Sequence, residues 1–240
     1  MVIKPCSLIL VAGLLTMLAP VCSARNSAGQ ILKQQERYTI SLQLEFSKKG
    51  PSALQRVISF LDWGPNGYAT GFLVGDGLVM TAYHVVSGEI TDSKKVALGF
   101  ERGDELNVKV FVNNCQAKVI RVDRDADLAL LSVCGFSRTK APAFQNILSK
   151  DEKLFMIARP HGERIVTHGV FYGSYNMRGQ EFWSVKIDAR DGFSGSPVYN
   201  EKAELVGVLS GYDWSQKLAL ISPGAKAQKL LEYYNANPTP

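Results

Sequence analysis

Short runs of strand-like composition recur along most of the sequence, and turn signals separate them. Two of these signals, Asn66-Gly67 and Asp76-Gly77, are dipeptides typical of two-residue hairpin turns. The expected strands are residues 37–46, 54–63, 68–75, 78–82, 94–100, 106–112, 117–122, 128–133, 153–158, 164–176, 181–187, 196–200, 204–211 and 217–222. No helices alternate with these strands, so the pattern argues against a parallel sheet and predicts an all-β fold of two packed barrels.

The first 24 residues are typical of a secretory signal peptide. Lys4 gives a positive start, Leu8 to Leu18 supply an apolar stretch, and Ser23-Ala24 is a small-residue cleavage site. The apolar stretch is short for a membrane span, and Pro20 interrupts it. We therefore expect an exported protein, secreted or periplasmic, with no stable membrane insertion after cleavage.

The remaining chain is expected to form one domain, residues 37–240, behind an N-terminal arm, residues 25–36. The first barrel is predicted over about residues 37–135, a connector over 136–152 and the second barrel over 153–222. Residues 223–236 have Pro223 near their start and apolar residues at helical spacing, which predicts the one long helix.

The charge balance gives no indication of a nucleic-acid partner. The net charge of +5 falls by one when Lys4 is removed, so the mature chain is only mildly basic. No cluster of Lys and Arg with interleaved aromatic residues occurs, and nucleic-acid binding is therefore not expected.

Two cysteines, Cys115 and Cys134, follow the signal peptide. The residues between them resemble a β-hairpin, and a tip at Arg124 and Asp125 would place the two cysteines opposite each other. An exported protein can oxidise such a pair, so we expect a disulfide, with two buried thiols as the alternative. A longer tip loop would shift this register.

The segment Gly192-Phe193-Ser194-Gly195-Ser196-Pro197 contains more turn-forming residues than a surface bend needs. Glycines of this kind can present a serine with bare backbone N–H groups beside it. A serine nucleophile also requires a base, and the chain has three histidines. His161 and His168 have the surroundings of ordinary structural histidines, whereas His84 follows an apolar strand that ends in small residues.

Three motifs occur in the order and spacing of a known family. They are Thr81-Ala82-Tyr83-His84, Asp127-Leu128-Ala129-Leu130-Leu131 and the serine segment at 192–197. Together they resemble the trypsin-like serine peptidase family, and most closely its bacterial glutamyl-endopeptidase and HtrA-type protease domains, without a PDZ domain. The resemblance implies a chymotrypsin-like fold of two six-stranded antiparallel barrels with a C-terminal helix.

The resemblance also implies a role for each motif. His84 would be the general base, Asp127 would orient it, and Ser194 would attack the substrate carbonyl. The N–H groups of Gly192 and Ser194 would form the oxyanion hole. Ser196 is a second nucleophile by composition alone, and Asp123 and Asp125 compete with Asp127. The motifs favour Ser194 and Asp127 over these neighbours.

Two further residues match substrate-binding positions of the family. Ser210 matches a position that hydrogen-bonds the catalytic aspartate and lines the cleft. Asp188 lies six residues before Ser194, where a carboxylate at the base of a pocket would select Lys or Arg side chains. Bacterial relatives also carry a structural aspartate near this place, so both interpretations of Asp188 stay open.

The sequence departs from the family at two positions. Phe193 stands where relatives carry Asp or Asn, so activation by a newly freed N-terminus is not available. The site would then be constitutively shaped, or ordered only by substrate. Leu209 stands where the glutamyl-specific branch has a histidine, so a preference for acidic residues before the cut is not supported.

Rival functions can be weighed against these residues. An α/β-hydrolase needs a histidine after its nucleophile, and none follows Ser194. A zinc hydrolase needs histidines at ligand spacing, which His161 and His168 do not have. A pseudoprotease that keeps the fold as a binding module is the remaining alternative, motivated by Phe193. We predict an exported serine endopeptidase that acts on proteins or peptides as a monomer and needs no metal or cofactor.

Overall fold

The computed structural model describes residues 33, 35–50, 66–137, 139–177 and 179–238. The predicted signal peptide, most of the predicted arm and the expected strand at 54–63 lie outside these residues. No helix of the described part is long and apolar enough to cross a membrane.

The first half of the molecule is a seven-stranded antiparallel sheet in the order β5-β4-β1-β2-β3-β7-β6. Its strands are β1 (Thr39–Lys48), β2 (Gly67–Gly75), β3 (Leu78–Ala82), β4 (Leu106–Val112), β5 (Cys115–Gln116), β6 (Lys118–Asp123) and β7 (Leu128–Ser132). The sheet curls over its core, but its edge strands β5 and β6 do not pair with each other. The expected six-stranded barrel is therefore a seven-stranded half-barrel, because β5 is only two residues long and pairs with β4 alone.

Turn chemistry sets the register at Asp76-Gly77, one of the two predicted hairpin signals. Gly75 pairs with Leu78, so Asp76 and Gly77 form the whole β2–β3 turn, and Gly77 has a φ of +64°. The other signal, Asn66-Gly67, does not form a two-residue turn, because Gly67 is already the first residue of β2 and pairs with Leu44. Asn66 accepts the N–H of Phe46 at 2.8 Å beside this pair.

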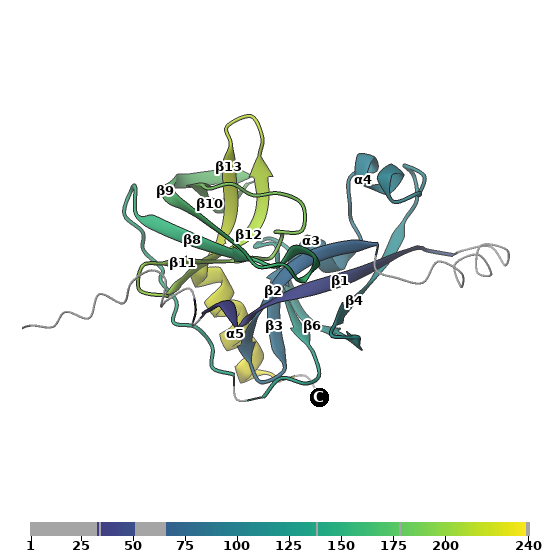
Figure 1. The fold of residues 1–240 in the computed structure, drawn as a ribbon, viewed down its shortest axis with the longest axis horizontal. Coiled ribbons are helices and arrows are strands. Elements are labelled where there is room, and N and C mark those ends of the chain that lie inside the picture. Colours follow the sequence, from purple (N-terminus) through teal and green to yellow (C-terminus); the bar gives the residue numbers. More distant parts are fainter. Residues whose placement is uncertain (1–32, 34, 51–65, 138, 178, 239–240) are drawn as a thin grey trace, which may run out of the picture.

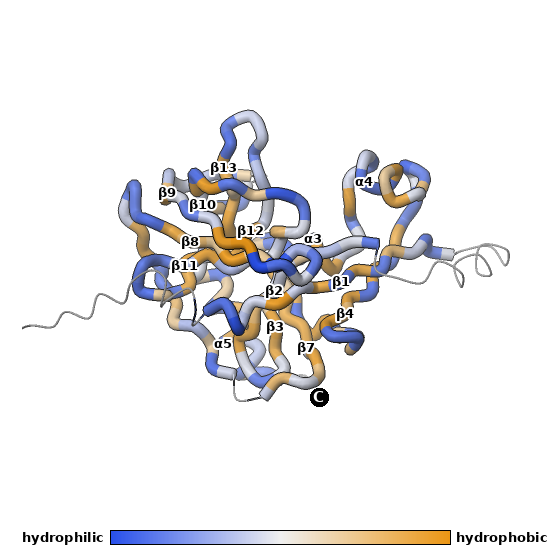
Figure 2. Tube along the Cα trace, in the orientation of Figure 1, coloured by the Kyte–Doolittle hydropathy of each residue, from blue (hydrophilic) through white to orange (hydrophobic). Residues whose placement is uncertain are grey.

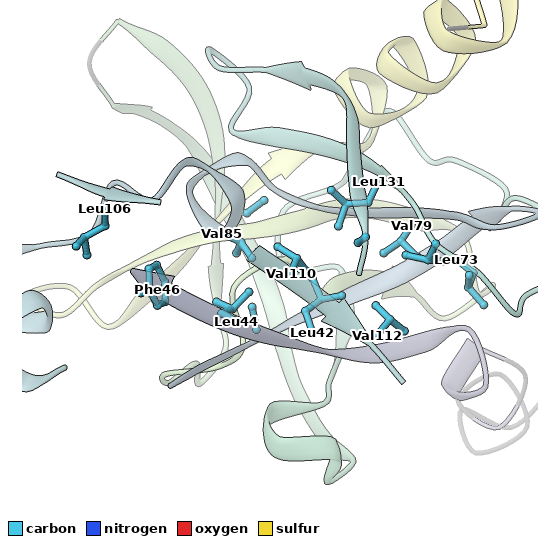
Figure 3. Packing of buried hydrophobic residues seen from close by; sticks show 14 residues of the cluster. Leu42, Leu44, Phe46, Leu73, Val79, Val85, Leu106, Val110, Val112 and Leu131 are labelled. Atoms are coloured by element: carbon cyan, nitrogen blue, oxygen red, sulfur yellow. The ribbon is translucent and has the colours of Figure 1, made fainter. Parts of the chain in front are cut away.

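The core of this half is built from alternate residues of its strands. On β1, Leu42, Leu44 and Phe46 point inward and are buried. They pack against Val79, Val110 and other aliphatic side chains from the facing strands, as Figure 3 shows. This packing supports the strands that end at the candidate site.

The second half is a closed six-stranded barrel in the order β10-β13-β12-β11-β8-β9. Its strands are β8 (Lys153–Ala158), β9 (Ile165–Met177), β10 (Gln180–Lys186), β11 (Pro197–Asn200), β12 (Leu205–Asp213) and β13 (Leu218–Pro223). A short 3-10 helix, η1 (Pro160–Gly162), connects β8 and β9. The barrel confirms the predicted chymotrypsin-like second half.

The C-terminal helix α5 (Gly224–Ala236) joins the two halves. It contacts β12 and β13 of the barrel and also β6 and β7 of the first sheet. Figure 1 shows it below the barrel strands. Its buried residues include Ala227, Leu230 and Leu231 at helical spacing, as the sequence predicted. Figure 2 shows hydrophobic residues along the strands and hydrophilic ones at the connections.

One expected strand, at residues 94–100, is wrong. The structure has helix α4 (Asp92–Ala97) there, with the Thr91 side chain accepting the N–H of Lys94 at its start. None of the α4 residues is buried. A half-buried strand is stabilised by packing one face against the core, and this segment has no such face. The helix α3 (Tyr83–Ser87), directly after β3, was also not expected.

The expected disulfide between Cys115 and Cys134 is present, with the two Cα atoms 6.2 Å apart. The hairpin register used to predict it is wrong. Asp123 pairs with Leu128, so the turn spans residues 124–127 rather than a tip at Arg124 and Asp125 alone. Cys115 lies on β5, which is one edge strand of the sheet and pairs with β4. Cys134 follows β7, next to the other edge strand, so the disulfide connects separate strands rather than the two arms of one hairpin.

Candidate active site

The predicted base and its orienting carboxylate are brought together. His84 lies in the first turn of α3, directly after β3, and Asp127 ends the β6–β7 turn. Nδ1 of His84 lies 2.8 Å from Oδ2 of Asp127, and the backbone N–H of His84 donates to Oδ1 at 2.8 Å. The two carboxylate oxygens therefore fix both the ring and the backbone of the histidine, and leave Nε2 directed elsewhere.

The local backbone explains why Asp127, and not a neighbour, reaches the histidine. Asp127 has a φ of +53°, and its carbonyl accepts the N–H of Tyr83 at 3.0 Å, which ties the turn to the start of α3. Asp123 instead accepts the N–H of Ala126 within the turn, and Asp125 is exposed. These two are ordinary turn carboxylates, as the motif implied.

The barrel contributes a third contact to this carboxylate. The hydroxyl of Ser210, on β12, hydrogen-bonds Oδ2 of Asp127. The Asp127 side chain is only 14% exposed, so its carboxylate is bound mainly by His84 and Ser210 rather than by water. The contact expected for Ser210 is present, and it connects the two halves of the molecule at the site.

The serine segment forms a tight loop between β10 and β11. Gly192 and Gly195 have φ values of +86° and +83°, which favour glycine. Phe193 donates its N–H to Arg190 at 3.1 Å, and Gly195 donates to the carbonyl of Leu209 at 2.8 Å. The unusual number of glycines in this segment thus corresponds to real left-handed backbone positions.

Close packing at Gly195 brings this loop against β3, the strand that directly precedes α3 and His84. A Cβ atom on Gly195 would lie 2.1 Å from Oγ1 of Thr81 and 3.0 Å from the backbone nitrogen of Ala82. The carbonyl of Ser194 also accepts the N–H of Thr70, on β2, at 3.0 Å. The serine loop therefore packs against the middle of β2 and the end of β3, the strand that directly precedes His84.

The neighbouring amides differ in their hydrogen bonding. Phe193, Gly195 and Ser196 all donate their N–H groups to carbonyl oxygens of the protein. Within the described residues, the N–H groups of Gly192 and Ser194 donate to none. These are the two amides expected to form an oxyanion hole.

The two serines of the loop lie in different environments. Ser196 is fully buried, and its hydroxyl has no hydrogen-bond partner among the described residues. Ser194 is partly exposed. Ser194 is therefore accessible from solvent, and Ser196 is not. The Ser194 hydroxyl and the His84 ring are not hydrogen-bonded to each other here, and such contacts often tighten only when substrate binds.

Phe193 anchors the loop from below. Its side chain is 2% exposed and packs in the barrel core with Met156, Val185 and Val198. The guanidinium of Arg190 lies over its ring, 5.5 Å from the centroid. A buried aromatic side chain thus holds the loop at the position where the resemblance leads one to expect Asp or Asn.

Thr70 is a residue that the sequence analysis missed. Its hydroxyl donates to the carbonyl of Gly192 at 2.9 Å and accepts the N–H of Arg159 at 3.0 Å. Thr70 is completely buried, so both bonds are shielded from water. A threonine inside a strand carries no sequence signal for such a role, because its partners lie 122 and 89 residues away.

The remaining candidates lie apart from this network. Asp188 follows β10 and is exposed, so its part in a specificity pocket stays a prediction that this exposure does not favour. His168 packs edge-on against Phe155 on β8. His161 lies in η1 and stacks on Tyr68. No group of three or more His, Cys, Asp or Glu residues in the described part could hold a metal ion.

Comparisons with known proteins agree with this geometry. Residues 69–208 match the family model described as a trypsin-like peptidase domain. No curated protein matches the chain. Among solved structures, the active form of the Rv3671c protease from M. tuberculosis matches with a TM-score of 0.60 and 16% identity, over 97% of this chain and 93% of that chain. Deg5 matches with a TM-score of 0.60 and 18% identity, over 90% of this chain and 96% of that chain.

Proposed function

Because the chain belongs to the trypsin-like peptidase family, we propose that it is an exported serine endopeptidase with His84, Asp127 and Ser194 as its catalytic residues. One observation carries this proposal. Asp127 is held at once by His84 from the first sheet and by Ser210 from the barrel. A binding module has no chemical need for this arrangement.

In the proposed reaction, Ser194 Oγ attacks the carbonyl carbon of the scissile peptide bond and gives its proton to Nε2 of His84. Asp127 stabilises the imidazolium that forms. The carbonyl oxygen becomes negative and accepts hydrogen bonds from the N–H groups of Gly192 and Ser194, which have no other acceptor among the described residues.

The tetrahedral intermediate then collapses. The C–N bond breaks, His84 returns the proton to the leaving amine, and an ester joins the acyl group to Ser194. Water attacks this ester with His84 as the base, and the serine is released with a new carboxylic acid. No metal or cofactor takes part in these steps.

Export is part of the proposal. The first 24 residues have the pattern of a signal peptide, and the Cys115–Cys134 disulfide suits an oxidising compartment such as the periplasm or the medium. We expect the mature protein to act as a monomer on protein or peptide substrates.

Two matched serine variants test the proposal. Ser194→Ala should fold normally and lower the rate of peptide hydrolysis by several orders of magnitude, because the nucleophile is lost. Ser196→Ala should keep most of the activity, because its hydroxyl is buried and unpaired. Rates on a peptide library and melting temperatures of both variants check this. Equal activity of Ser194→Ala and the wild type would refute the assignment.

The pseudoprotease alternative predicts a different outcome. A binding module would fold normally, cleave no peptide in the library and show no difference between the two serine variants. Phe193, which motivated this alternative, is buried in the barrel core and anchors the serine loop by packing, so the loop has an apolar support in place of an acidic one.

A further inference from the structure

A cavity of about 420 Å³ lies between the start of β1 and the η1 turn. Three of its lining residues, Arg37, Arg159 and His161, have basic side chains, and no carboxylate lines it. This size suits a short segment of peptide with a side chain.

The η1 side of this cavity is connected to the serine loop. A Cβ atom on Gly192 would lie 2.7 Å from Cβ of Pro160, so η1 covers Gly192 directly. The N–H of Arg159 bonds Thr70, which in turn bonds the Gly192 carbonyl. A group bound in the cavity is therefore held in a fixed relation to the reacting atoms.

The charge around the cavity is positive. Arg159 and Arg164 share the carboxylate of Glu36, at 4.0 Å in the case of Arg159. Arg37 donates to the Tyr38 hydroxyl at 2.7 Å and forms no ion pair among the described residues. The carboxylate of Glu36 thus pairs with two of the three guanidinium groups, and Arg37 is left without an acidic partner among the described residues. Glu163, in the same turn, is exposed and pairs with none of them.

One guanidinium atom also lacks a partner. Nε of Arg159 is buried and has no hydrogen bond among the described residues. A buried unpaired donor of this kind costs free energy. The rest of the Arg159 side chain is partly exposed in the cavity lining, and its one ion pair, to Glu36, is long at 4.0 Å, so a further carboxylate in the cavity can pair with it.

The position of the cavity indicates which part of a substrate would enter it. The far end of the serine loop, Gly195 and Ser196, bonds Leu209 on β12. The near end, Gly192, is covered by η1. A substrate whose acyl half runs along β12 therefore directs its leaving half toward η1 and the cavity.

We infer that the cavity binds an acidic side chain downstream of the scissile bond, so that the enzyme prefers substrates with Asp or Glu in the leaving half. This inference rests on the proposed function. It concerns residues after the cut, and is separate from the side chain before the cut, where Asp188 and Leu209 lie.

Matched peptides that differ only by Glu or Gln at each of the first three downstream positions test the preference. At low salt, kcat/KM should be about three- to tenfold higher for the Glu peptide at one position, and the ratio should shrink at high salt because the attraction is electrostatic. Arg37→Gln should move this ratio toward one. Arg102→Gln, an equal charge change in the loop before β4, should leave both rates unchanged, because Arg102 is exposed and does not line the cavity.

Binding of the same peptides to Ser194→Ala separates the two proposals. Tighter binding of the Glu peptide, together with cleavage by the wild type, supports both. Cleavage without any Glu preference in rate or binding overturns the inference and keeps the peptidase. Tighter binding of the Glu peptide without cleavage supports an acidic-peptide cavity and overturns the peptidase. Equal binding without cleavage overturns both.

Discussion

The half of the molecule that carries His84 and the half that carries Ser194 hold their residues by different means. In the first half, side-chain hydrogen bonds fix the proposed base, since the Asp127 carboxylate binds both the ring and the backbone N–H of His84. In the barrel, backbone geometry fixes the proposed nucleophile, since Gly192 and Gly195 adopt left-handed conformations and Phe193 is buried in the core.

This difference teaches where each half is vulnerable. A change to the Asp127 side chain should alter chemistry and spare the fold, because the turn keeps its backbone bonds. A change at Gly195 should alter the fold and the chemistry together, because the loop has no space for a side chain.

The largest effect is expected from Asp127→Asn. An amide at this position cannot balance the imidazolium and favours the wrong histidine tautomer, so kcat should fall by about 10⁴, as in related triads. The melting temperature should change little. Steady-state kinetics and thermal unfolding measure the two quantities.

Asp123→Asn is the matched control for this variant. Its amide oxygen can still accept the N–H of Ala126, so activity should stay near that of the wild type. A comparable loss of kcat in both variants would mean that the turn, rather than the carboxylate at 127, controls catalysis.

The next largest effect is expected from Gly195→Ala. The added Cβ would lie 2.1 Å from Oγ1 of Thr81 and 2.3 Å from the Thr70 carbonyl, at a φ of +83°. The free energy of unfolding should fall by about 3 kcal/mol or more, from overpacking and left-handed strain together. Urea unfolding measures this loss.

Gly99→Ala separates the two causes. Gly99 has a φ of +82° but nothing within 4 Å of the added Cβ, so only the strain remains, about 1–2 kcal/mol. If both variants lost the same stability, close packing of the serine loop against β2 and β3 would not be what holds it.

The smallest effect is expected from Thr70→Val. The Thr70 side chain links the two halves, because it lies on β2 and bonds backbone groups of the second half. The Gly192 carbonyl and the Arg159 N–H would lose their partner, so stability should fall by about 1–3 kcal/mol. Because the loop would also be less fixed, kcat should fall with little change in KM. Thr70→Ser should restore both quantities. A loss of stability with an unchanged kcat would reduce Thr70 to a structural role.

Much of the site could be predicted because its motifs are local. His84 follows shortly after β3, Asp127 directly precedes β7, and Ser194 lies in the loop just before β11. Small or turn-forming residues mark each of these places in the sequence. The hairpin at Asp76-Gly77 was predicted for the same reason, because two adjacent residues determine the whole turn.

The rest depended on contacts that are distant in the chain. The role of Thr70, the cover that η1 places over Gly192 and the open edge of the first sheet all arise from pairing between separate segments. The composition of residues 94–100 suited a strand. No sheet strand lies where these residues could pair and bury one face, and residues 92–97 form the exposed helix α4 instead. The Cys115–Cys134 bond was predicted correctly from an incorrect register.

The central claim is that a base from the first sheet activates a serine of the barrel. Reaction of the purified mature protein with a fluorophosphonate, followed by peptide mass spectrometry, tests it most directly. We predict a single adduct on Ser194 that is lost in folded His84→Ala protein. Well-folded wild type that stays unlabelled, or labelling that is unaffected by His84→Ala, would contradict the account.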